Sequence, residues 1–167
     1  MAESHPLDDP ADAEALARYA EALVEAAGEA IPRWVARSVA RTLAAQGAVP
    51  ADEQDIDEQV RTASEAAARD GVARLRALLV TDVDEQAGTP LAVLRSLVAY
   101  PTAVLRRAGA RPVARDEFRE RSFPDDPYDL SPASFADVDP ALHEPGLVWG
   151  AAKAHVHLAR RRREGKR

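Results

Sequence analysis

Apolar residues recur along most of the chain at intervals of three and four, the spacing of one face of an α-helix. The first such stripe covers residues 12–27 and a second covers residues 31–43. Gly28 lies between the stripes and Pro32 suits the first turn of a helix, so we expect two separate helices. Residues 1–10 are expected to be frayed.

A third stripe covers residues 50–88 and is long for one helix of a globular protein, so we expect a kink or slight break at Asp70–Gly71. Thr89 is a good N-cap, and Pro90 a good first residue, for the helix that follows. That helix is apolar on nearly every side, which is typical of a buried central element. Pro101 is expected to kink or split it, because proline removes a helical hydrogen bond.

Residues 110–146 differ from the rest of the chain, because six prolines and four aromatic rings are spread through them. A stretch of this length without a helical pattern is usually functional or disordered, and the aromatic rings argue against disorder. We therefore expect an extended strap, held to the helices by its rings, with short turns at Ser131–Pro132 and Asp139–Pro140. A last helix is expected from about Pro145, followed by a frayed basic tail at residues 160–167.

Together these elements predict one all-α domain over residues 1–167, an irregular bundle of four to five helices with the long Pro- and aromatic-rich strap packed on it. The apolar share of 46% and the charged share of 30% are typical of a folded globular protein. Alanine is the commonest residue and buries little area per side chain, so the core is expected to be marginal alone. This favours stabilisation by a protein partner or by a second copy of the chain.

Composition and motifs exclude several kinds of chemistry. The chain has no cysteine, which removes disulfides, thiolate metal sites and cysteine nucleophiles. The sequence contains no phosphate-binding glycine loop, nucleophile elbow or zinc-protease motif, so we expect no cofactor and no metal. The first residues do not resemble a secretory signal and no apolar run could span a bilayer, so we expect a cytoplasmic protein without a membrane span.

Charge is segregated along the chain, whose net charge is −6. Residues 1–58 and 116–144 are acidic, whereas residues 59–115 and 145–167 are basic. Such blocks either pair within the fold or present a positive surface to an anionic partner. The densest basic cluster is either a solvated tail or a contact for nucleic acid, anionic lipid or an acidic groove. It consists of Arg160, Arg161, Arg162, Arg163, Lys166 and Arg167.

The acidic part of the strap holds the other candidate site. Residues 125–129 have the letter pattern DDxxD and thereby resemble the magnesium motif of all-helical prenyl-chain synthases. Pro127 breaks a helix and those enzymes need a longer chain with a second acidic motif, so turn chemistry is favoured, with a weak metal or partner contact as the alternative. The strap and the last helix could together close a pocket. Its candidate partner-binding residues are Asp125, Asp126, Tyr128, Asp129, His143, Trp149, Lys153 and His155.

Trp34 lies among Arg33, Arg37 and Arg41. A cation–π contact is one interpretation of this spacing, but a tryptophan on the inner stripe of a helix is more often part of the core.

No catalytic residue stands out, so the favoured function is a non-enzymatic protein-interaction or regulatory module. The alternative is an accessory factor that docks on a nucleic-acid machine (RNA, DNA or polymerase) through the Arg-rich tail. An enzyme built on the aspartates and histidines of the strap and the last helix is a third hypothesis.

Overall fold

The structure, a computed structural model, describes residues 10–50, 52–80, 89–113 and 126–142. In chain order its elements are α1 (Pro10–Ala45), α2 (Glu53–Val80), α3 (Pro90–Ser96), α4 (Ala99–Arg107), α5 (Phe135–Val138) and the 3₁₀-helix η3 (Pro140–Leu142). All regular secondary structure in these residues is helical, which confirms the all-α class. None of the described helices combines the length and the apolar character that crossing a membrane requires.

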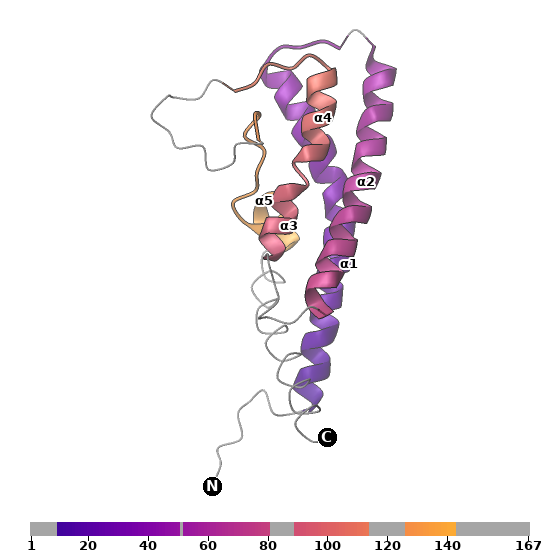
Figure 1. Cartoon of the computed structure of the whole chain (residues 1–167), viewed down its shortest axis with the longest axis vertical. Coiled ribbons are helices and arrows are strands. Elements are labelled where there is room, and N and C mark those ends of the chain that lie inside the picture. Colours follow the sequence, from indigo (N-terminus) through magenta and orange to yellow (C-terminus); the bar gives the residue numbers. More distant parts are fainter. Residues whose placement is uncertain (1–9, 51, 81–88, 114–125, 143–167) are drawn as a thin grey trace, which may run out of the picture.

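The other elements assemble around α1. It lies beside α2 in an antiparallel pair, and α4 packs against both helices (Figure 1). α5 and η3 also contact α1. The prediction that the segment 90–107 is central and buried on nearly every side is wrong, because Ala92, Ala99 and Ala103 are exposed. That segment buries one side only, and the contacts that join most of the other elements are made by α1.

The two helices predicted for residues 12–43 are one uninterrupted helix, α1. A β-carbon at Gly28 would lie 2.9 Å from Val72 Cγ2, so this glycine lets α2 approach closely and does not end the helix. Pro32 removes one helical hydrogen bond, but buried side chains on either side of it, such as Ile31, hold the helix together. Tertiary packing thus overrides the local stop signals.

Of the kink or slight break predicted at Asp70–Gly71, the break is absent, because α2 runs through both residues, and the kink stays a prediction. A β-carbon at Gly71 would lie 2.8 Å from Ile31 Cδ1 and 2.9 Å from Leu97 Cδ1, closer than carbon atoms pack in proteins. This glycine therefore marks the place where three helices meet.

The helix predicted over residues 90–107 is divided into α3 and α4, as its internal proline indicated. The turn lies at Leu97–Val98, and Pro101 occupies the first turn of α4, where a missing N–H costs no helical hydrogen bond. The predicted start is confirmed as well, because Thr89 caps α3 by accepting a hydrogen bond from the N–H of Ala92 at 3.1 Å.

Two clusters of buried apolar side chains form the core. The larger joins α1, α2 and α3 to Val138 and Leu142 of the strap, and it includes Trp34, as expected for a tryptophan on the inner stripe. The smaller joins α1 and α4 to Ala110 and Tyr128. The described parts of the strap therefore contribute to both clusters.

Short turns occur in the strap at one of the two predicted places. η3 follows Asp139, whose Oδ1 accepts a hydrogen bond from the N–H of Ala141 at 3.0 Å. No helix begins at Ser131–Pro132. The nearest helix, α5, begins later because Ser134 and Asp137 form its capping box.

Candidate functional site

Three of the candidate partner-binding residues lie in the described part of the chain: Asp126, Tyr128 and Asp129. The predicted pocket between the strap and the last helix therefore stays a prediction, as does the role of the basic tail. The candidate residues outside the described part are Asp125, His143, Trp149, Lys153, His155, Arg160, Arg161, Arg162, Arg163, Lys166 and Arg167.

Asp126 is buried, with 3% of its surface exposed, and its carboxylate is engaged by the strap itself. Oδ1 accepts a hydrogen bond from the N–H of Leu130 at 2.9 Å, and Oδ2 accepts one from the N–H of Ser131 at 2.7 Å. A buried carboxylate bound to backbone amides in this way fixes a turn. Asp126 therefore shapes the strap around the candidate site.

Tyr128 faces the helices and joins the two described arms of the strap. Its hydroxyl donates a hydrogen bond to the carbonyl of Ala110 at 3.0 Å, and the N–H of Val113 donates one to the carbonyl of Pro127 at 2.9 Å. Asp129 is exposed and has a φ of 58°, in the left-handed region that aspartate tolerates. In the residues that the structure describes, no three acidic or histidine side chains gather as a metal site would require.

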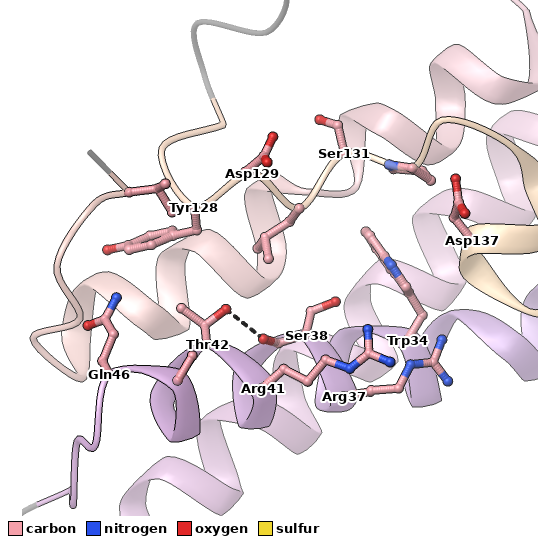
Figure 2. Close-up of a pocket in the computed structure, with 14 residues that line it drawn as sticks. Trp34, Arg37, Ser38, Arg41, Thr42, Gln46, Tyr128, Asp129, Ser131 and Asp137 are labelled. Carbon is pink, nitrogen blue, oxygen red and sulfur yellow. Dashed lines mark hydrogen bonds between the residues drawn. The ribbon is translucent and has the colours of Figure 1, made fainter. Parts of the chain in front are cut away.

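A groove of about 610 Å³ lies between α1 and the strap (Figure 2). Gln46 stands at one end, where its side chain binds the backbone of Arg111. Asp137 of α5 stands at the other end. We call this feature the α1–strap groove; its walls include Trp34, Arg37 and Arg41 from α1, and Tyr128, Leu130 and Ser131 from the strap.

Three arginines stand one turn apart on the α1 side: Arg33, Arg37 and Arg41. Nη2 of Arg33 lies 3.3 Å from Oδ2 of Asp139, and Nη2 of Arg37 donates a hydrogen bond to the carbonyl of Val138 at 2.7 Å. Arg41 is exposed and forms no hydrogen bond or ion pair with the described residues. Two arginines thus hold the strap, and the third lines the groove with no partner for its guanidinium among the residues that the structure describes.

The Arg33–Asp139 contact affects the ionisation of the strap. The backbone N–H of Ala141 lowers the pKa of the Asp139 carboxyl, and the guanidinium of Arg33 lowers it further. Asp139 therefore stays ionised to more acidic pH than a free aspartate, and the contact with α1 persists with it.

Neither of the two carboxylates at the groove pairs with Arg41, which has no acidic partner in the described part of the chain. Oδ2 of Asp137 accepts hydrogen bonds from the N–H groups of Ala133 and Ser134 at 2.8 Å and 2.9 Å, which places its charge at the start of α5. The carboxylate of Asp129 points away from α1 in Figure 2. The α1 side of the groove therefore presents positive charge beside hydroxyl and aliphatic side chains, an arrangement suited to recognition by shape and charge.

A second groove, of about 690 Å³, lies between α2 and α4, and its lining combines alanines such as Ala63 and Ala103 with polar side chains such as Glu58 and Arg107. Tyr100 also lines it, and burial together with the nearby Asp70 raises the pKa of its phenol.

Trp34, Arg37 and Arg41 are groove residues that were absent from the sequence-based site. The four-residue spacing of the arginines was visible in the sequence, and it placed them on one face of a helix. Their position opposite the strap was not visible, because Arg37 meets Val138 across 101 residues of chain. A long-range contact of this kind has no local signal.

Comparisons of the chain with protein-family models, with curated proteins and with solved structures found no match.

Proposed function

We propose that the protein is a non-enzymatic helical protein-interaction or regulatory module of the cytoplasm, and that the α1–strap groove is its docking site. One observation carries the proposal: a groove of about 610 Å³ has walls held by hydrogen bonds and buried rings, and yet leaves the guanidinium of Arg41 without an acidic partner among the described residues. The groove combines apolar side chains with hydroxyl, amide and charged groups, and polar groups placed in a preformed cavity give a binding site its specificity.

The proposal extends to the architecture that presents the groove. We treat residues 1–167 as one domain, an irregular bundle of four to five helices on which the strap of residues 110–146 packs. The buried positions of Tyr128, Val138 and Leu142 support this arrangement. Bound on the strap side, a partner protein would add buried area to a core that is rich in alanine.

A photo-crosslinking amino acid at Ser131, which lines the groove, tests the docking site in cells. The same amino acid at Ala73, exposed on α2 and outside both grooves, is the matched control. We expect a discrete adduct with one polypeptide from Ser131 that Ala73 does not give. Copurification of that polypeptide should be lost in Ser131→Trp, which fills the groove, and kept in Ala73→Trp. Identical adducts from both positions, or none, would contradict the proposal.

The second candidate function, an accessory factor of a nucleic-acid machine, is supported by the sequence of residues 160–167 alone. It predicts an association with RNA, DNA or a polymerase that weakens with salt and disappears when these residues are deleted. Binding that neither treatment changes would remove this alternative.

A further inference from the structure

We propose that the α1–strap groove recognises a single acidic side chain in an extended segment of the partner protein, and that Arg41 is the residue that binds its carboxylate. The inference rests on the proposed function and adds the chemistry of the partner.

The first step is the difference between three similar arginines. Arg33 and Arg37 are engaged by Asp139 and by the carbonyl of Val138, at 3.3 Å and 2.7 Å. Arg41 continues the same row by one turn and lines the groove, yet it contacts no acid in the described part of the chain. A guanidinium presents a planar set of N–H donors that matches the two oxygens of a carboxylate.

The second step is the character of the surface around Arg41. Trp34 and Tyr128 are almost fully buried, each with 4% of its surface exposed, so they support the groove from below, and the apolar surface open to a ligand comes from aliphatic side chains such as Leu130 and the exposed Val113. Aliphatic side chains of this kind suit the apolar part of a peptide, whereas the guanidinium suits one charge. The occupant is therefore a mainly apolar segment that carries one acid.

The third step concerns why a run of acids fits less well. Asp129 and Asp137 stand on the strap side of the groove. Both would repel further carboxylates that extend beyond Arg41. The arrangement favours one acid at the centre of the segment over an acidic stretch, which distinguishes this groove from a general anion-binding surface.

The experiment uses the full-length chain and two N-acetylated, C-amidated peptides, Gly-Leu-Glu-Leu-Gly and the same peptide with Gln in place of Glu. Binding is followed by NMR at the indole N–H of Trp34 and the amide of Ser131, with Trp34 assigned through Trp34→Phe. We expect the Glu peptide to shift both signals and to bind about two- to fivefold more tightly than the Gln peptide, the range for an exposed ion pair. Higher salt should reduce the difference.

Substitutions then test whether Arg41 is responsible. Arg41→Gln should abolish the preference for Glu, and Arg41→Glu should prefer a Lys peptide. Arg106→Gln, an equal loss of charge at an exposed position of α4, should keep the preference for Glu. Thermal unfolding followed by circular dichroism verifies that each variant is folded.

Four results would overturn the inference: equal binding of the two peptides, shifts confined to other residues, an equal effect of Arg106→Gln, or occupation of the groove by the protein itself. The last is detected without peptide. Signals of Trp34 that change on dilution would indicate a second copy in the groove. Signals of Trp34 that change in the triple variant Asp116→Asn, Glu117→Gln and Glu120→Gln would indicate that residues 116–120 of the same chain occupy the groove. If the Ser131 adduct forms regardless of the charge at Arg41, the docking site stands and this inference alone fails.

Discussion

The side-chain amide of Gln46 pairs with both backbone groups of Arg111. Nε2 donates a hydrogen bond to the carbonyl of Arg111 at 2.6 Å, and Oε1 accepts one from its N–H at 2.8 Å. One residue just after α1 thereby binds the first arm of the strap and closes an end of the α1–strap groove.

Replacing Gln46 should loosen this end of the groove. Gln46→Ala removes two hydrogen bonds, and we expect it to lower the free energy of unfolding by about 1–2 kcal/mol. Urea denaturation measures the change. Gln54→Ala, at an exposed position of α2, is the matched control and should change the stability much less. Equal losses in the two variants would show that the pairing with Arg111 contributes nothing.

The contact of Gly71 with Ile31 and Leu97 should reverse the usual effect of glycine replacement in a helix. Alanine normally stabilises a helix relative to glycine by about 1 kcal/mol. Here the added β-carbon meets Ile31 Cδ1 and Leu97 Cδ1 at 2.8 Å and 2.9 Å, so we expect Gly71→Ala to destabilise the protein by about 1–3 kcal/mol.

A double-mutant cycle identifies the clash at Gly71. Ile31→Val removes the Cδ1 atom, so its cost should be smaller in the Gly71→Ala background than in the natural sequence. Denaturation of the four proteins measures the coupling. Simple additivity would contradict the close approach.

The apolar pattern of the sequence located α1 to α4 but did not predict α5, and the helix boundary predicted at Gly28 and Pro32 and the break predicted at Gly71 were wrong. Apolar spacing indicated all of α1 and α2. A glycine that ends a helix and one that admits a neighbouring helix look the same in sequence, because only the partner, Val72 for Gly28, distinguishes them. Thr89 and Pro101 were interpreted correctly because capping and proline geometry act within one turn.

The candidate site was less accessible to sequence reasoning. Asp126 and Tyr128 were among the predicted partner-binding residues of the strap. In the structure they shape the strap beside the groove. The predicted site did not include the α1 side, because Arg41 lines a groove only together with residues that lie almost 90 positions later in the chain. Charge and spacing on one helix do not reveal what packs opposite.

The carboxylate of Asp126 should be among the most important polar groups of the strap. In Asp126→Asn one acceptor oxygen becomes an NH₂ donor that faces a backbone N–H, either of Leu130 or of Ser131. We expect a loss of about 1–3 kcal/mol in the free energy of unfolding. Asp129→Asn is the control, since asparagine tolerates its φ of 58° and the residue is exposed. A loss in the control as large as that in Asp126→Asn would refute this role.

Acid should weaken the contact between Arg33 and Asp139. Because the folded state lowers the pKa of Asp139, its contribution to stability is complete above the ordinary aspartate pKa and disappears as the pH falls through the lowered value. Arg33→Gln should raise the pKa of Asp139 only part of the way, because the N–H of Ala141 remains and is the larger cause. NMR titration of the Asp139 carboxyl measures both proteins. An unchanged pKa in Arg33→Gln would mean that the ion pair is absent in solution.

The account depends most on the strap being a fixed wall beside α1, and hydrogen exchange at two of its amides tests this directly. The amides of Leu130 and Ser131 donate to the buried carboxylate of Asp126, so NMR should find their exchange strongly slowed in the native protein. Asp126→Ala should speed the exchange, and Asp129→Asn, which keeps a residue that tolerates the φ of 58°, should not. Exchange of both amides in the unaltered protein at the rate of an unstructured peptide would contradict the account, because the groove would then lack its second wall.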